Sequence, residues 1–268
     1  MSKQMIIKLF ENNVKGKCAD TSSRNVNHDG WEGHWLEQQF GIEPNSNNGA
    51  DLFGYELKKE TSSKTSFGDW SANRYIFKTG SYFQYFEGDT FKDRQNSFCQ
   101  IFGKPNPHKN NRYSWSGSSC PKINSFNEVG QKLVIDDNGD IVAIYCYTQD
   151  TRLNKYSIVP IAFQQEDLEL ARWFGKSSPS NNKGDKCLKL KLEDKFNDAG
   201  WFTIKKDGNG RYKQLCFGEP INFDRWLNLI KEGTVFFDSG MYQGNSRPYS
   251  LWRANNKFWD SLITEIYE

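Results

Sequence analysis

The chain has 268 residues, and its 35 basic and 33 acidic side chains give a formal net charge of +2, which excludes a histone-like polycation and an acidic tail protein. No apolar run approaches the roughly 20 residues that span a bilayer, and the N-terminus lacks a signal-peptide pattern, so we expect a cytoplasmic protein without a membrane partner. Mean hydropathy is −0.80, yet aromatic residues make up 15% of the chain, more than disordered proteins usually carry, which predicts a folded protein.

The first pattern along the chain predicts a short helix. Asp29 and Glu32 have the spacing of a helix N-cap and its capping box, and Gly41 predicts the end of the helix. Glu37 is therefore expected on this helix.

A tight turn and a strand are predicted next, within residues 50–58. Gly54 suits the turn, and residues 55–58 alternate as a strand does. Because alternate side chains of a strand share a face, Glu56 and Lys58 should point the same way.

Two hairpins are predicted further along. Residues 132–135 and 141–145 flank an Asp-Asn-Gly-Asp sequence at 137–140, and Asn-Gly tolerates the positive φ of a tight primed turn. A looser hairpin tip is expected at 206–211. Other signals are a linker-like stretch at 176–186 and a late strand at 235–237. The fold class is mixed α/β, with more strand than helix.

Two segments without acidic residues, 95–127 and 239–259, make the charge distribution uneven. Cations neutralise phosphates, and amide or hydroxyl side chains reach base edges, so this composition favours contact with nucleic acid; ordinary solvated loops are the alternative. Arg112 and Arg247 are expected to read guanine. The candidate DNA-contacting residues are Lys104, His108, Lys109, Arg112, Tyr113, Trp115, Tyr242, Gln243, Asn245, Arg247, Tyr249 and Arg253.

The strongest chemical signal is Asp51, followed after four residues by Glu56 and then by Lys58. Hydrolysis of a phosphodiester needs a divalent cation, and Mg²⁺ prefers carboxylate oxygens, so Asp51 and Glu56 could share one ion. Lys58 could hold the attacking water or balance charge at the phosphate. A surface strand with a chance Glu/Lys pair is the alternative.

These residues carry a resemblance to a known family. Residues 32–37 and 51–58 resemble the helix-Glu, Asp and Glu-x-Lys signature of the MutH mismatch-repair nickase and the MvaI/BcnI restriction endonucleases. Looser similarity to that family occurs at 101–104, 113–117, 133–147, 237–244 and 249–253.

The resemblance implies a PD-(D/E)XK restriction-endonuclease-like core with two lobes that form a DNA-binding cleft. It makes Asp51 and Glu56 the Mg²⁺ ligands, Lys58 the catalytic lysine and Glu37 a helical carboxylate near the metal. The sequence departs from the family pattern at Lys59, where many relatives have Thr. It departs again at residues 247–248, Arg-Pro, where MvaI-like enzymes tend to carry histidine and glycine.

The same resemblance predicts how the lobes divide the chain. Residues 1–95 would form the first part of the catalytic lobe, residues 96–185 mainly the DNA-recognition lobe, and residues 186–268 the return to the catalytic lobe with a DNA-contacting loop. The implied enzyme is a monomeric, Mg²⁺-dependent type II site-specific deoxyribonuclease that cuts double-stranded DNA at a short target of the CC-N-GG sort. A cognate DNA methyltransferase would protect the host genome.

Three alternatives stay open at this point: a methyl-directed or repair nickase of the MutH type, a carbohydrate-binding protein, and a non-catalytic DNA-binding protein. Neither binding protein needs Asp51, Glu56 and Lys58 together.

The six cysteines are scattered without a CxxC pair, which favours reduced, individually packed thiols. A metal site at Cys99, His108 and Cys120 is a weak alternative, because structural zinc sites normally close with four ligands. Trp201, Trp226 and Trp259 are expected in the core.

Overall fold

The computed structural model describes residues 2–20, 30–43, 48–59, 61–179 and 185–268. The chain folds into two compact units, and each is assembled from segments that are far apart in the sequence. The first unit comprises residues 1–65, 191–222 and 255–268, and the second comprises residues 66–190 and 223–254.

These units divide the chain at positions other than the predicted lobe boundaries. Residues 66–95 pack with the second unit, because β3 within this segment pairs with β8. Residues 223–254 also belong to the second unit, where β11 pairs with β13. The roles of the lobes in catalysis and recognition stay predictions.

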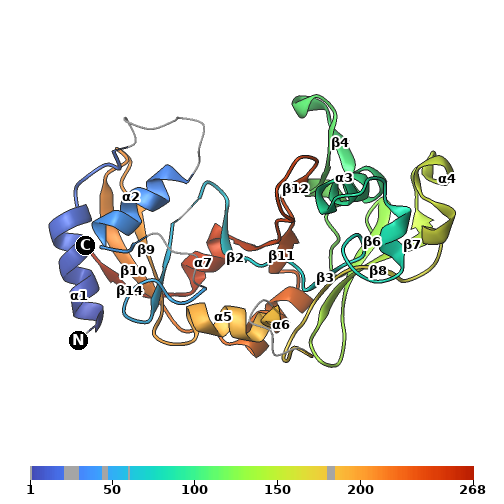
Figure 1. Ribbon diagram of the computed structural model, residues 1–268. Helices are drawn as coiled ribbons and strands as arrows, with labels where there is room; N and C mark the ends of the chain where they lie inside the picture. The colour runs from blue at the N-terminus through green and yellow to red at the C-terminus, as the bar shows by residue number, and fades with distance from the viewer. Residues whose placement is uncertain (1, 21–29, 44–47, 60, 180–184) are drawn as a thin grey trace. The chain divides into compact units, whose positions relative to one another are not determined.

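The first unit is built on a four-stranded sheet with the order β1-β9-β10-β14 (Figure 1). β1 runs parallel to β9, and the remaining neighbours are antiparallel. The strands are β1 (Tyr55–Lys58), β9 (Gly200–Lys206), β10 (Tyr212–Gly218) and β14 (Ile263–Tyr267).

One face of this sheet packs on the N-terminal helices, which lie beside the strands in Figure 1. Tyr55 and Leu57 of β1 join a buried cluster with Phe10, Leu36 and Phe40. The helices on this face are α1 (Ser2–Leu9), the π-helix η1 (Phe10–Val14) and α2 (Trp31–Gln39).

The opposite face receives Glu56 and Lys58, since they alternate with Tyr55 and Leu57. Aromatic rings fill this face: the Trp259 ring lies 5.0 Å from that of Trp201 on β9. Its helices are α5 (Leu188–Phe196) and α7 (Asn256–Ser261).

The second unit contains most of three small sheets, with strand orders β3-β8-β7-β6, β11-β13-β2 and β12-β5-β4. Their strands are β2 (Lys64–Asp69), β3 (Arg74–Tyr75), β4 (Lys104–Asn106), β5 (Arg112–Trp115), β6 (Val129–Ile135), β7 (Ile141–Asp150), β8 (Leu168–Trp173), β11 (Val235–Asp238), β12 (Met241–Tyr242) and β13 (Leu251–Asn255).

Helices and an aromatic core join these sheets. The Trp252 ring lies 5.6 Å from Trp173, 5.4 Å from Trp226 and 5.3 Å from Phe237. The helices are α3 (Phe91–Phe102), α4 (Lys155–Ile158), α6 (Phe223–Lys231) and the 3₁₀ turns η2 (Tyr82–Tyr85), η3 (Pro107–Lys109), η4 (Gly117–Ser119) and η5 (Ile161–Phe163).

Most of the predicted elements are confirmed. The helix that carries Glu37, the strand at 55–58, both hairpins and the late strand are all present. The expected N-cap, Asp29, lies outside the described residues, so its capping box with Glu32 stays a prediction. The Glu32 carboxylate accepts a hydrogen bond from the Tyr212 hydroxyl at 2.6 Å.

The loop between β6 and β7 is longer than the predicted primed turn. It comprises residues 136–140, and within it only Gly139 has a positive φ, of 74°. The Asp136 carboxylate accepts hydrogen bonds from the backbone N–H groups of Asn138 and Asp140, at 3.0 and 2.9 Å. A two-residue primed turn would need a second residue with a positive φ. Here, the hydrogen bonds to the Asp136 side chain stabilise the longer loop without one.

The expected burial is also largely confirmed. Trp201, Trp226 and Trp259 are buried. The cysteines are free thiols, and five of them are buried while Cys18 is exposed. The central part of the predicted linker, residues 180–184, lies outside the described residues. None of the helices within the described ranges is long and apolar enough to cross a membrane.

We predict that Gly218→Ala lowers the free energy of unfolding by about 1–3 kcal/mol. Gly218 lies opposite Trp201 across β10 and β9, and a Cβ atom there would come 2.2 Å from the indole Cε2. Trp201 is 1% exposed, so its ring has little room to shift. Denaturant unfolding measures the loss.

Gly208→Ala in the β9–β10 hairpin is the matched control, since its Cβ would meet nothing within 4 Å. Equal unfolding midpoints for the two variants would contradict the packing argument.

Candidate active site

The turn before β1 fixes Asp51 against the strand. Leu52 and Tyr55 form an isolated antiparallel bridge, and Gly54 between them has a φ of 82°. The Asp51 Oδ2 atom accepts a hydrogen bond from the Leu57 N–H at 2.9 Å. Asp51 is thereby tied to the strand that carries Glu56.

Glu56 is the most buried carboxylate of this group, with 2% of its surface exposed. Its Oε1 atom lies 2.8 Å from Nζ of Lys58 and 2.9 Å from Nζ of Lys195. Sequence reasoning missed Lys195. It is 139 positions away, on α5, and no pattern around it signals the contact.

Burial and mutual proximity shift the ionisation of these groups. Burial raises the pKa of Asp51 to about 6, and the nearby Glu56 carboxylate adds to the rise. Burial alone would raise the pKa of Glu56, but Lys58 and Lys195 hold it below its ordinary value. Burial lowers the pKa of Lys58, against the opposing effect of Glu56. The site thus combines two carboxylates and two amines in a partly desolvated place.

The donor set of this site fits a hard divalent cation. The Oε2 atom of Glu56 is buried and has no hydrogen-bond partner in the described part of the chain. A buried carboxylate oxygen without a partner is costly, and oxygen is the ligand that Mg²⁺ prefers. Asp51 and Glu56 are therefore suited to hold the ion that the sequence predicts.

Glu37 has a different partner. Its Oε2 atom lies 3.0 Å from Nδ1 of His34, on the same helix. Across the described ranges, no group of three His, Cys, Asp or Glu side chains has a metal-binding arrangement, at Cys99, His108 and Cys120 or elsewhere. The role of Glu37 near the metal stays a prediction.

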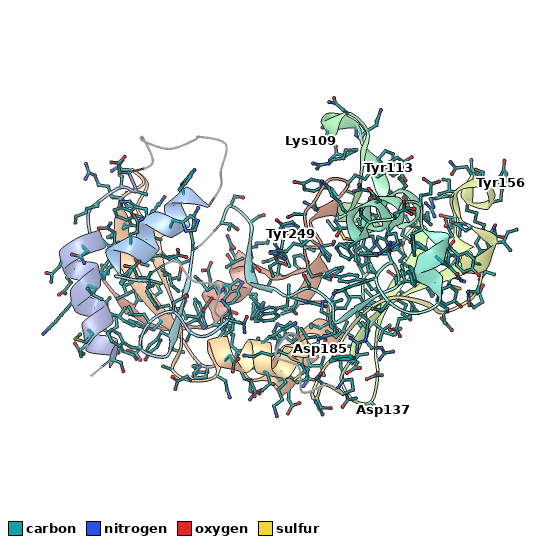
Figure 2. All side chains as sticks on the ribbon, viewed as in Figure 1. Lys109, Tyr113, Asp137, Tyr156, Asp185 and Tyr249 are labelled. Atoms are coloured by element: carbon teal, nitrogen blue, oxygen red, sulfur yellow. The ribbon has the colours of Figure 1, made fainter. Side chains whose placement is uncertain are left out.

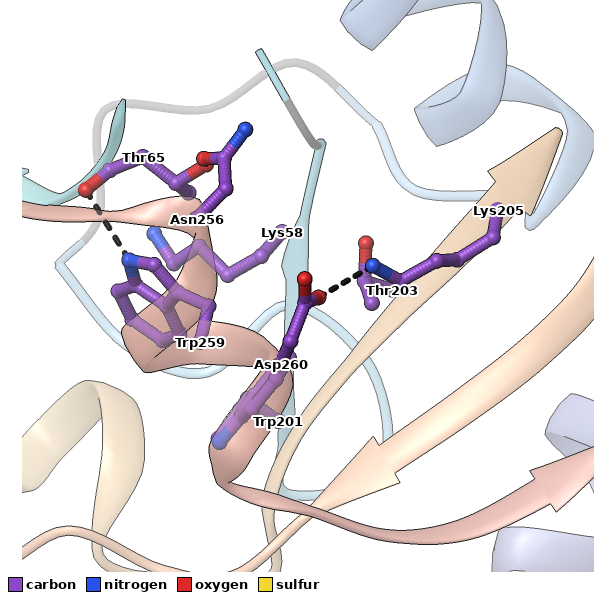
Figure 3. A pocket seen from close by; sticks show the side chains of 8 residues that line it. All are labelled: Lys58, Thr65, Trp201, Thr203, Lys205, Asn256, Trp259 and Asp260. Carbon is purple, nitrogen blue, oxygen red and sulfur yellow. Dashed lines mark hydrogen bonds and ion pairs between the residues drawn. The ribbon is translucent and has the colours of Figure 1, made fainter. Parts of the chain in front are cut away.

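Lys58 also lines a small pocket between β9 and α7 (Figure 3). The pocket wall includes the rings of Trp201 and Trp259, and the Trp259 indole N–H donates to the Thr65 carbonyl at 3.2 Å. At its rim, Lys205 forms an ion pair with Asp260. Aromatic packing around the stem of Lys58 limits its freedom and keeps its ammonium group near Glu56.

The β4–β5 hairpin presents several of the DNA-contacting candidates. Lys109 lies at its tip, and Figure 2 shows Lys109 and Tyr113 along it. His108 is next to Lys109 and is exposed. The Arg112 guanidinium stacks 3.4 Å from the centre of the Tyr242 ring. Lys104, by contrast, forms an ion pair with Glu128 within the protein.

Two of the candidate readers hold a loop in place. Gln243 accepts a hydrogen bond from the Tyr113 N–H at 2.8 Å through its side-chain oxygen. Asn245 is 6% exposed, and its side-chain oxygen accepts from the Tyr242 N–H at 2.6 Å. The buried Asn245 is thus a structural residue of the loop.

The remaining candidates differ in exposure. Trp115 is 0% exposed and donates to Gln131 at 2.5 Å, so it is a core residue and the predicted DNA contact is corrected. Arg247 is half exposed; it forms a 2.6 Å ion pair with Asp69 and lies over the Tyr249 ring. Arg253 lies 3.4 Å from Asp238.

Comparison with known proteins identifies the family. A model of the LlaMI restriction endonuclease family matches residues 14–267. The type II restriction enzyme ScrFI of Lactococcus lactis subsp. cremoris is 54% identical over 268 residues, covering 100% of this chain and 99% of ScrFI. Among solved structures, restriction endonuclease MvaI in complex with cognate DNA substrate has a TM-score of 0.59 at 14% identity, covering 100% of this chain and 98% of MvaI.

The protein is a sequence-specific DNA endonuclease, of the mixed α/β fold that MvaI shares. The chain belongs to the LlaMI restriction endonuclease family. These findings confirm the expected type II restriction endonuclease with an MvaI-like fold, and they decide against the carbohydrate-binding alternative.

We predict that Asn245→Ala lowers the free energy of unfolding by about 1–3 kcal/mol in the absence of DNA, because it removes the buried acceptor of the Tyr242 N–H. Thermal or denaturant unfolding measures the change. Ser246→Ala, at an exposed neighbouring position, should leave stability nearly unchanged. If Asn245→Ala were as stable as the wild type, its assigned role in the loop would be wrong.

Proposed function

We propose that the enzyme hydrolyses phosphodiester bonds of double-stranded DNA with Mg²⁺, at a site formed by Asp51, Glu56 and Lys58. The observation that carries this proposal is the unpartnered, buried Oε2 atom of Glu56 beside the Asp51 carboxylate. A buried pair of carboxylates is unfavourable by itself, and a divalent cation offsets that cost.

In this mechanism, Asp51 and Glu56 hold the ion. When bound, Mg²⁺ supplies positive charge at the scissile phosphate and acidifies water for attack. Lys58 is aligned by its 2.8 Å contact with Glu56, so its ammonium group can hold the attacking water or stabilise charge on the phosphate. The turn at Gly54 keeps Asp51 in register with β1.

The β4–β5 hairpin and the loop after β12 are the proposed DNA-contacting elements. Lys109, His108 and Arg112 would bind phosphates or base edges from the hairpin. Arg247 would read a base from the loop, and to do so it must exchange its contact with Asp69 for the DNA. Arg112 is held by Tyr242 in an orientation that restricts its rotamers.

We further propose that the enzyme acts as a monomer and that a cognate DNA methyltransferase protects the host genome. ScrFI is named a type II restriction enzyme, and MvaI was solved with a cognate DNA substrate. A full-length match to both supports self-sufficient cleavage by this chain.

We predict that Glu56→Gln and Asp51→Asn each lower the rate of Mg²⁺-dependent DNA cleavage by at least about a hundredfold, because each removes a charged ligand from the ion. Lys58→Met should cause a similar loss through the missing ammonium group. Sequencing of the fragment ends after digestion of phage DNA identifies the target. Single-turnover cleavage of a duplex that contains this target then measures the rate.

Binding of the same duplex in Ca²⁺ should be largely retained by these variants. Glu11→Gln, an exposed carboxylate on the first unit, serves as the control and should cut normally. Wild-type cleavage rates in Glu56→Gln would remove Glu56 from the site.

We predict that Lys109→Ala weakens binding to all DNA sequences alike and reduces the salt slope of the binding constant by about one unit. Lys109 is exposed at a hairpin tip, whereas Lys104 is engaged with Glu128. Lys104→Ala should therefore change the slope less. Binding titrations at several salt concentrations test this, and an unchanged slope for Lys109→Ala would make the hairpin tip a solvated loop.

A further inference from the structure

Lys195 is the second cation at Glu56, and it reaches the site from a different part of the chain. Its Nζ atom lies 2.9 Å from Glu56 Oε1, the same oxygen that Lys58 contacts. The side chain is 18% exposed, and the Glu56 side chain is 3% exposed. An ammonium group this close to a desolvated carboxylate interacts with it far more strongly than a surface pair does.

Backbone hydrogen bonds attach the end of α5, which carries Lys195, to the segment before β1 and to the segment after β10. The Ala50 N–H donates to the Asp194 carbonyl at 3.0 Å, directly beside Asp51 in sequence. The Ile221 N–H donates to the Phe196 carbonyl at 3.0 Å, and the Phe196 side chain is fully buried. Residues on both sides of Lys195 are thus fixed, and its position toward Glu56 is defined by the fold.

The two lysines leave the carboxylate of Glu56 with one occupied and one free oxygen. Both ammonium groups contact Oε1, while Oε2 is buried without a partner. Lys58 belongs to the Glu-x-Lys motif, whereas Lys195 has no assigned role. Its place on Oε1 holds the carboxylate in one orientation and leaves Oε2 for a further ligand.

We propose that Lys195 is a positioning residue that orients Glu56 through Oε1 and competes electrostatically with the divalent cation for this carboxylate. The inference rests on the proposed function, in which Asp51 and Glu56 bind the ion. Lys195 supplies the counter-charge of Glu56 in the metal-free enzyme and raises the concentration of divalent ion that the enzyme needs.

A purely structural lysine would behave differently. If Lys195 only held α5 in place, its removal would loosen Glu56 and weaken binding of the cation. If it competes with the cation, its removal takes away a positive charge that lies 2.9 Å from Glu56 Oε1, and binding of the cation tightens. The Coulomb repulsion between a single and a double positive charge a few ångströms apart, even at a high effective dielectric constant, corresponds to about a tenfold change in the dissociation constant of the cation.

The test is Ca²⁺ binding by Lys195→Met, measured by calorimetry on the full chain with and without an uncleaved duplex. We expect Ca²⁺ to bind about tenfold more tightly than to the wild type, while the thermal midpoint of the metal-free variant falls. Lys195→Arg keeps the charge and should bind Ca²⁺ like the wild type. Lys189→Met removes an exposed lysine from the same helix and should change neither quantity.

Lys195→Gln is a second neutral variant, and circular dichroism checks that both neutral variants are folded. Ca²⁺ affinity that is unchanged or weaker in the folded neutral variants would overturn the competition. Wild-type Ca²⁺ affinity in Glu56→Gln would instead overturn the metal site itself. The first result leaves the proposed function standing, and the second does not, so the two failures are distinguishable.

Discussion

The buried carboxylate of Glu56 is the constraint on which the packing of the first unit around β1 depends. A charged group with 2% exposure is tolerated only when opposite charge and hydrogen bonds surround it. Lys58 supplies one cation from the same strand, and Lys195 supplies another from α5. β1 lies at the edge of the sheet, where it pairs in parallel with β9, and helices pack on both of its faces. The order of the strands and the position of α5 therefore together bring the two lysines to Glu56.

The alternation of side chains along β1 separates its apolar residues from its charged ones. Tyr55 and Leu57 enter the apolar cluster with the N-terminal helices, while Glu56 and Lys58 enter the face with Trp201 and α7. A register shift by one residue would bury the charges in the apolar cluster and move Tyr55 and Leu57 to the face that now holds Glu56 and Lys58. The packing that stabilises the sheet thus also decides which side chains can form the site.

The sequence was informative wherever the signal is local. The glycine at position 54 and the alternation over residues 55–58 predicted both the turn and the strand, because each is governed by neighbouring residues. Lys195 could not be predicted, since its contact with Glu56 depends on how β9 and α5 fold back. Trp115 was misjudged for the same reason: an aromatic residue among basic ones has the composition of a DNA contact, and only tertiary packing shows that it is buried.

The parallel β1–β9 ladder also bears on when the nuclease becomes competent during synthesis. Tyr55 lies opposite Gly200, so closing this ladder must wait until most of the chain has left the ribosome. An interrupted chain that ends before α5 contains Asp51, Glu56 and Lys58 but lacks the neighbouring strand that aligns them. Truncated products of such a gene therefore carry the residues of the proposed site without the scaffold that would make them dangerous to the genome of their own cell.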